Sequence, residues 1–269
     1  DMMQLIVAPT LSYKVDERHA VGVSPLLVYQ RFKASGLQAF VPMSGDQAHV
    51  TDKGYDSSTG LGVRLGYIGK PNEVVTIGAS WSPKTKMKKF DKYAGLFAGG
   101  GGFDIPENMG IGLALQVTPS VLLATDVQRI NYSKVASVGN PSTNQAQLGA
   151  ANGPGFGWSD VNVLKLGVQW QASSQWTLRA GYNKTDNPIQ ARDVSFNIIA
   201  PGVISKHYTL GGTCQLGRDR ELSLAYMYAP KSSVTGDSLL GMMNNPPMMF
   251  QETIRMSQQS LGVQYGWKF

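Results

Sequence analysis

The residue types that most often catalyse reactions or bind metal ions are present in this chain, but they are not arranged for either task. The three histidines, His19, His49 and His207, share no spacing that is typical of a metal site. Serine, histidine and aspartate occur without the sharp turn that presents a nucleophilic serine. The glycines at 99–102 lack the Lys-Ser/Thr pair of a phosphate-binding loop. The sequence therefore predicts no metal, no cofactor and no catalysis, and the single cysteine, Cys214, is interpreted as a small apolar residue.

Four charged residues stand at positions that alternate with apolar ones, which places them on one face of extended strands: Arg64, Asp126, Lys165 and Arg179. A cation on that face could hold the carboxylate of a ligand. The alternative is a ladder of charges of the kind that lines a polar barrel interior, and we favour the ladder.

The net charge of +6 raises the question of a nucleic-acid partner. Lysine and arginine are scattered along the chain, and their one dense group is Lys84, Lys86, Lys88, Lys89 and Lys92. Because binding to a phosphate backbone needs a continuous basic face, we expect no nucleic-acid partner.

The stretch Ser257–Phe269 shows which elements position these residues. Its apolar side chains fall on every second position, with Ser, Gly, Gln, Gly and Lys between them: Leu261, Val263, Tyr265, Trp267 and Phe269. Alternation with a period of two predicts a strand with one apolar and one polar face. The aromatic residues near its end favour a membrane β-barrel over a soluble sandwich. No stretch approaches the roughly 18 apolar residues that a spanning helix needs.

The same alternation predicts ten further strands, at 3–15, 21–32, 61–67, 75–81, 109–117, 121–132, 164–170, 176–182, 208–216 and 222–228. Their connections alternate between turns of about four residues and loops of about twenty or more, which is typical of an outer-membrane barrel with short periplasmic turns. The expected fold is thus an all-β, transmembrane antiparallel barrel with eleven strands in this chain. Single-chain bacterial barrels have even strand numbers, so we expect strands ahead of Asp1, or a count that is wrong by one. Nothing at Asp1 resembles a signal peptide.

Five stretches, taken in order along the whole chain, resemble the FadL/TodX family of outer-membrane transporters for long-chain fatty acids and other hydrophobic compounds: IVAPTLSY from Ile6, GLGVRLGY from Gly60, FDIPEN from Phe103, QWTLRAGY from Gln175 and LSLAYMY from Leu222. The resemblance implies a fourteen-stranded barrel that is plugged by an N-terminal hatch. The eleven strands would match the fourth to the fourteenth, so residues 1–269 would form one barrel domain without the hatch and about three strands.

The resemblance also implies that the loops 33–58 and 82–107 carry short helices that form an outer apolar groove for ligand capture. The residues agree with this, because one set falls at three- and four-residue spacing on one face of a short helix: Met87, Phe90, Tyr93, Leu96 and Phe97. Facing candidates are Leu37, Phe40, Val41 and Met43. Two alternatives stay open, namely a loop helix packed on its neighbours, and lysines that bind anionic lipopolysaccharide.

A further loop carries adaptable apolar side chains that suit ligands of variable shape: Leu239, Leu240, Met242, Met243, Met248, Met249 and Phe250. Packing of this loop on itself over the barrel mouth is the alternative that we favour.

These observations together predict passive uptake, through the outer membrane, of a hydrophobic ligand such as a fatty acid or an aromatic or aliphatic hydrocarbon. The expected partners are that ligand, outer-membrane lipid and lipopolysaccharide, and the protein is expected to be a monomer. Two other classes of function remain as alternatives, a structural or adhesive barrel and an outer-membrane lipase.

Overall fold

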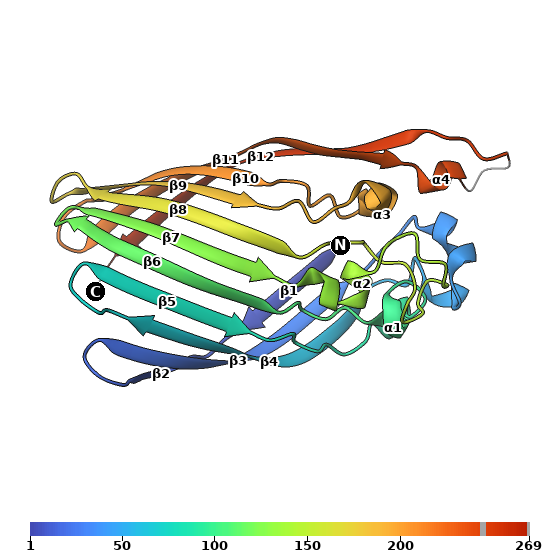
Figure 1. The fold of residues 1–269 in the computed structure, drawn as a ribbon, viewed down its shortest axis with the longest axis horizontal. Coiled ribbons are helices and arrows are strands. Elements are labelled where there is room, and N and C mark those ends of the chain that lie inside the picture. Colours follow the sequence, from blue (N-terminus) through green and yellow to red (C-terminus); the bar gives the residue numbers. More distant parts are fainter. Residues whose placement is uncertain (243–245, 268–269) are drawn as a thin grey trace.

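A computed structural model describes residues 1–242 and 246–267. They form a twelve-stranded antiparallel sheet in which β1 and β2 both pair with β3, and from β3 onward each strand pairs with the next one along the chain (Figure 1). The strands are β1 (Met2–Val7), β2 (Leu11–Lys14), β3 (His19–Phe32), β4 (Asp56–Gly69), β5 (Val75–Ser82), β6 (Asn108–Thr118), β7 (Val121–Ile130), β8 (Val161–Gln171), β9 (Trp176–Thr185), β10 (Lys206–Gln215), β11 (Arg220–Asp237) and β12 (Gln251–Trp267). Met243, Lys268 and Phe269, which the sequence assigned to an apolar loop and to the last strand, lie outside the described residues.

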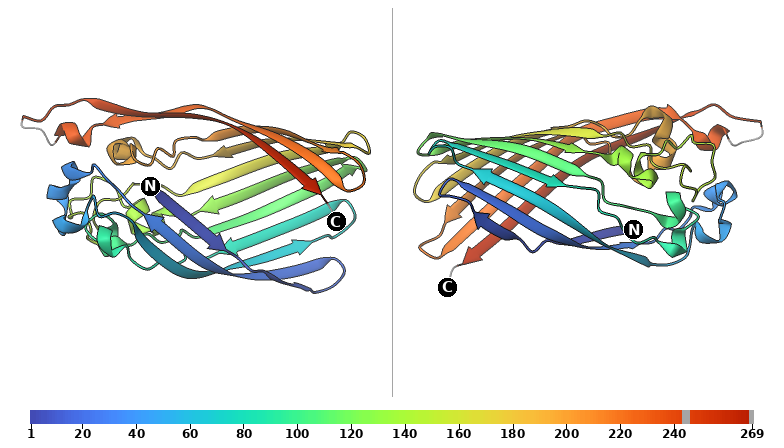
Figure 2. Two further views of the ribbon diagram at one scale, coloured as in Figure 1. Left: turned by 180° about the vertical axis from the view of Figure 1, so that it is seen from behind. Right: turned by 60° about the horizontal axis from the view of Figure 1, so that its bottom comes forward.

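The sheet curves into the wall of a barrel, with β1 and β12 at its two edges (Figure 2). In the described part of the chain the sheet stays open between these edges. The expectation that further strands complete the wall stays a prediction.

Ten of the eleven expected strands are single elements, and the first is divided in two. Val7 pairs with Leu27 and Leu11 with Val23, so β1 and β2 share one register against β3. Continuing that register places Pro9 opposite Pro25. Neither proline has an N–H to donate, so the ladder cannot form between them. The expectation of one unbroken strand over 3–15 was therefore wrong at this point.

The two faces of the sheet differ as the alternation predicts. Outward side chains are apolar and strongly exposed, for example Leu61 at 77%, Leu261 at 72% and Val263 at 65%. The intervening positions of the last strand, such as Gly262 and Gln264, face the interior of the barrel. The apolar surface that a soluble protein would bury is thus turned outward, as in a membrane barrel. The helices among the described residues are all too short or too polar to span a membrane.

Connections at the two ends of the sheet differ in length. Short turns span 15–18, 70–74, 119–120, 172–175 and 216–219, and longer loops span 33–55, 83–107, 131–160, 186–205 and 238–250. The last loop is much shorter than the expected 230–254, because β11 and β12 continue their pairing beyond a bulge near Ala229. Polar residues carry this extension, including Thr235 and Thr253, whose hydroxyls lie 2.8 Å apart. Because both faces of this extension are largely polar, the alternation of apolar and polar residues could not predict it.

The four loops 33–55, 83–107, 131–160 and 186–205 pack together over one end of the sheet and are called the loop cap (Figure 1). They carry the short helices η1 (Gln38–Met43), η2 (Gln47–His49), η3 (Asp91–Tyr93), α1 (Ala98–Gly101), η4 (Tyr132–Lys134), α2 (Ala136–Gly139), η5 (Ala191–Asp193) and α3 (Val194–Asn197). The described helix outside the cap is α4 (Leu239–Met242). Buried aromatic and aliphatic side chains join these loops, so the cap has a core of its own.

Candidate functional site

The loop cap encloses a cavity of about 650 Å³, within the range of small-molecule sites. All four loops of the cap contribute to its lining, which is mainly apolar. The large side chains around it are Met2, Phe32, Leu37, Phe40, Leu96, Phe97, Phe103, Leu148, Phe156, Phe196, Ile198 and Ile199. Residues separated by more than 160 positions in the chain therefore meet at one site.

Aromatic contacts within a loop, between a loop and β3, and between two loops form walls of the cavity. The ring of Phe97 lies 4.8 Å from that of Phe32 and 4.9 Å from that of Phe103, measured between centroids. On the opposite side, Phe40 meets Phe196 edge to face at 5.3 Å. Rings at these separations attract one another beyond the burial of their surfaces. The cavity therefore depends on the loops staying packed together.

Phe90 and Tyr93 do not line the cavity, but they pack against Phe97, which does. Both side chains are fully buried, in one cluster with Phe97. The Tyr93 hydroxyl donates a hydrogen bond of 2.6 Å to the Gly54 carbonyl and accepts one of 3.1 Å from the Ala34 N–H. These bonds tie the 83–107 loop to both ends of the 33–55 loop.

The expectation that one short helix gathers Met87 to Phe97 on one face was wrong. Helical structure within this range is limited to η3, because α1 begins only at Ala98. The first residues of the range are extended instead, since the Lys88 N–H donates to the Thr59 carbonyl of β4 at 2.9 Å. Met87 lies before η3, in an extended segment that bridges to Gly60 of β4, and it packs against Leu26 and Val28.

Of the eight residues predicted to bind ligand, Leu37, Phe40, Leu96 and Phe97 meet around the cavity. Met43 is half-buried at the end of η1, where its carbonyl accepts the Leu148 N–H, and it is not in the lining. Sequence reasoning missed eight large lining residues: Met2, Phe32, Phe103, Leu148, Phe156, Phe196, Ile198 and Ile199. For the six of them that lie in loops, the one signal was that bulky apolar residues interrupt otherwise polar, Gly-rich or Asn-rich segments.

Of the three serines in the lining, Ser35, Ser137 and Ser195, the last two use their hydroxyls to bind protein partners. Ser137 donates to the Gly102 carbonyl, and Ser195 donates to the Glu252 carboxylate. The Lys33 ammonium lies 4.8 Å from the centre of the Tyr55 ring. The surface that the cavity offers for contact is therefore mainly apolar.

A buried polar cluster holds the cavity wall formed by Phe156 and Phe196. The Asp193 carboxylate, fully buried, accepts the Ser142 N–H at 2.8 Å and the Arg192 Nε–H at 3.1 Å. Asn197, also fully buried, accepts a hydrogen bond from Trp158 Nε1–H and donates to the Phe156 carbonyl, both at 2.6 Å. These bonds fix the 131–160 loop to α3.

The four charged residues predicted for the interior lie on the inner face of the sheet, but they do not converge on one point. Asp126 of β7 and Lys165 of β8 are direct cross-strand partners. Lys165 donates to Gln128 at 3.2 Å, whereas Arg179 of β9 donates to Gln169 and Thr213, each at 2.8 Å. Arg64 lies on β4, far along the sheet from β9. This arrangement supports the ladder over a carboxylate site.

Two carboxylates at the base of the loop cap have lowered pKa values. Hydrogen bonds from Trp81 and Asn131 lower the pKa of Glu107. Burial acts to raise the pKa of Asp160, but the Ser133 N–H and the Arg129 guanidinium outweigh it and lower that pKa. Both groups are therefore anionic at neutral pH and serve to join β-strand ends to loops.

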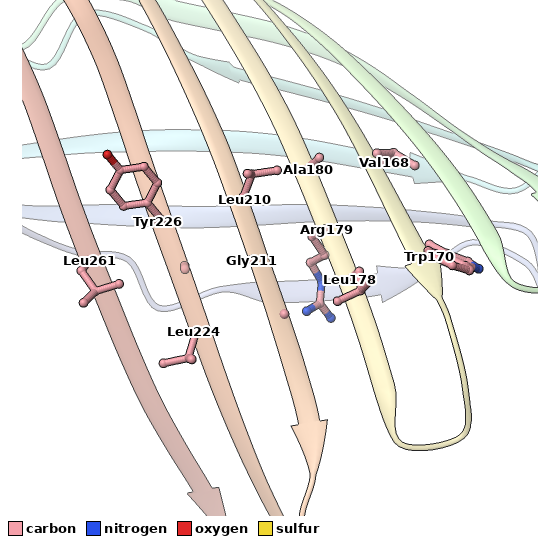
Figure 3. A pocket seen from close by; sticks show the side chains of 12 residues that line it. Val168, Trp170, Leu178, Arg179, Ala180, Leu210, Gly211, Leu224, Tyr226 and Leu261 are labelled. Carbon is pink, nitrogen blue, oxygen red and sulfur yellow. The ribbon is translucent and has the colours of Figure 1, made fainter.

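The outer wall carries a hollow of about 560 Å³ over β8–β12 (Figure 3). It arises where Gly211, Gly212 and Ala225 leave space among outward side chains such as Leu210, Tyr226 and Leu261. Its lining is part of the apolar outer surface of the wall, so acyl chains of the membrane can fill it. We therefore take the cavity in the loop cap, and not this hollow, as the candidate functional site.

Comparisons with known proteins agree with this fold. No curated protein matches the chain. Among solved structures, the P. putida toluene transporter TodX has a TM-score of 0.62 and 16% identity over 100% of this chain and 70% of its own. A Pseudomonas aeruginosa FadL homologue has a TM-score of 0.63 and 14% identity, covering 98% of this chain and 67% of its own. The Ralstonia pickettii toluene transporter TbuX has a TM-score of 0.59 and 15% identity, covering 99% and 68%.

At such identities, these structures show the fold alone. The family is shown by a sequence model described as outer membrane protein transport protein (OMPP1/FadL/TodX), which matches residues 1–269. The chain therefore belongs to the FadL/TodX family of outer-membrane transport proteins.

Proposed function

We propose that this protein takes up small hydrophobic compounds passively, and that the cavity in the loop cap is where they are captured. The observation that carries this proposal is the apolar lining, drawn from four loops at the end of an outer-membrane barrel. TodX is described as a toluene transporter and CymD as a monoaromatic hydrocarbon channel, which supports ligands of this kind. The proposal includes no chemical step on the ligand.

Neutral ligands fit the cavity better than charged ones. The hydroxyls of Ser137 and Ser195 are engaged elsewhere and the carboxylate of Asp1 lies in the same lining, so a buried carboxylate would have few partners besides Lys33 and Ser35. Burying an ion without partners costs far more than burying apolar surface. Apolar burial, at about 0.8 kcal/mol per methylene, supplies affinity without directed contacts. An aromatic or aliphatic hydrocarbon is therefore the proposed ligand class.

Replacing Ile199 with aspartate tests this proposal. Ile199 lines the cavity yet is 59% exposed, so a charge there leaves the loop cap folded but faces the ligand. We expect the initial rate of labelled toluene uptake by cells to fall about tenfold, the effect of roughly 1.4 kcal/mol. Variants are compared at equal amounts in the outer membrane.

The matched control is Met249→Asp. Met249 is 90% exposed at the same end of the barrel but does not line the cavity. Its uptake rate should equal that of the unaltered protein. Equal rates for both variants would show that ligands do not pass through this cavity.

A further inference from the structure

A second groove lies on the outer face of the wall, over β1, β3 and β4, and the proposed function does not use it. Its volume is about 830 Å³. Outward apolar side chains form its length: Leu5, Val7, Leu27, Tyr29 and Leu61. Lys86 and Lys88 line the same groove where it meets the loop cap. It therefore combines an apolar trough with two cations at one end.

The backbone holds both lysines on the outer side. The segment around Met87 bridges to Gly60 of β4, and the Lys88 N–H donates to the Thr59 carbonyl at 2.9 Å. Met87 is turned inward and packs against Leu26 and Val28, so the residues on either side of it point outward. A Cβ at Gly60 would lie 2.3 Å from the Met87 sulfur, so glycine is needed for this close approach.

More positive charge gathers beside the groove. Arg31, two residues after Tyr29 on β3, has its guanidinium 4.2 Å from the centre of the Tyr55 ring. Its Nε is buried, and the described residues offer it no hydrogen-bond partner. Arg31, Lys86 and Lys88 take part in none of the ion pairs found in the described part of the chain. Two carboxylates lie close by: Asp104 accepts the Met87 N–H at 2.9 Å and pairs with Lys84 at 3.7 Å, and Asp1 accepts the Tyr55 hydroxyl.

We infer that this groove binds a phosphorylated lipid of the outer leaflet, with its phosphate beside Lys86 and Lys88 and an acyl chain along Leu27 and Leu61. Lysine is a common phosphate ligand, and exposed apolar patches rimmed by polar groups mark binding sites. The charge of the groove complements the phosphate, and its apolar length complements the chain. Val28 and Met87 also line the groove, and with Leu26 they form a buried cluster that lies between the groove and the interior of the barrel.

The experiment is native mass spectrometry of the full-length protein, extracted from the outer membrane, with bis-phosphorylated lipid A as the probe. In the double variant K86Q/K88Q we expect bound lipid A to fall at least tenfold. The contacts that position Lys86 and Lys88 are made by the backbone of Lys88 and the side chain of Met87, so K86Q/K88Q should keep the thermal stability of the unaltered protein.

The matched control is K184Q/K206Q. These two lysines are exposed cross-strand partners on β9 and β10, on the same face as Tyr182 and Tyr208, and they lie near the same end of the wall. Their replacement should change lipid A binding less than twofold. An equal loss of bound lipid A in both double variants would mean a general attraction between lipid A and exposed lysines, and would overturn the assignment. Unchanged lipid A binding in both variants would overturn it as well.

Two further probes separate the lipid from its phosphate. Lipid A without phosphate groups should bind at least tenfold more weakly than the phosphorylated form. Inorganic phosphate at millimolar concentration should not displace the lipid. Displacement by inorganic phosphate would identify a site for the free ion and would contradict a lipid site.

Discussion

Replacing Phe90 with aspartate is expected to unfold the loop cap and to stop hydrocarbon uptake, while the strands of the barrel remain paired. Phe90 is fully buried, and its ring lies 5.9 Å from that of Phe32 and 6.0 Å from that of Phe97. Loss of a buried phenylalanine costs about 3–5 kcal/mol, and a buried carboxylate adds to this. A change at this position thus removes the support of the cavity and does not merely alter its surface.

Hydrogen exchange measures this outcome locally. The Phe90 N–H donates to the Gly101 carbonyl at 2.8 Å and the Gly101 N–H donates to the Phe97 carbonyl at 3.0 Å, so these amides report on the cap. They should exchange far faster in Phe90→Asp, whereas amides of β7 and β8 should keep their protection. Phe90→Leu, which stays apolar, should retain most of the protection. Protected cap amides in the aspartate variant would contradict the described core.

The second large effect is expected for Gly157→Ala, which should detach the 131–160 loop from α3. Gly157 has a φ of 67°, and an added Cβ would lie 2.1 Å from the Asp193 carboxyl carbon. The carboxylate cannot retreat easily, because it is fully buried and bonded to Ser142 and Arg192. Left-handed backbone costs roughly 1–2 kcal/mol and overpacking a further 1–3 kcal/mol, so about 2–5 kcal/mol is expected.

Gly54→Ala is the control for this prediction. Gly54 has nearly the same φ, 68°, but nothing lies within 4 Å of its missing Cβ. It should therefore lose only the backbone contribution, about 1–2 kcal/mol. The readout is the exchange rate of the Ser142 N–H, together with toluene uptake. Equal effects of the two variants on that amide would show that contact with Asp193 plays no part.

The wall of the barrel could be predicted from sequence because each of its strands obeys one local rule. Lipid on one side and a polar lumen on the other impose a period of two, and Leu261, Val263 and Tyr265 display it directly. The rule fails where this contrast is absent. Thr235 and Thr253 extend β11 and β12 without apolar alternation, and the position of Pro9 opposite Pro25, where the ladder is interrupted, depends on a register that only the fold defines.

The cavity could be predicted only in part, because non-local contacts build it. Phe40 and Leu96 were accessible to reasoning about two loops, whereas Phe196 reaches Phe40 from a loop more than 150 residues later. The spacing from Met87 to Phe97 suggested a helix, but the segment around Met87 pairs with Thr59 and Gly60 of β4 and is therefore extended. Local spacing therefore identified apolar residues that belong to the cap without showing which of them support the cavity and which line it.

The most direct test of hydrocarbon capture by the loop cap is the anomalous X-ray scattering of bromotoluene soaked into crystals of the protein. We predict an ordered bromine peak within the cavity, in contact with Phe40, Leu96 and Phe97, and its loss in Ile199→Asp. A cavity without bromine, while bromine is ordered in the outer hollow beside Leu210 and Leu261, would contradict the account.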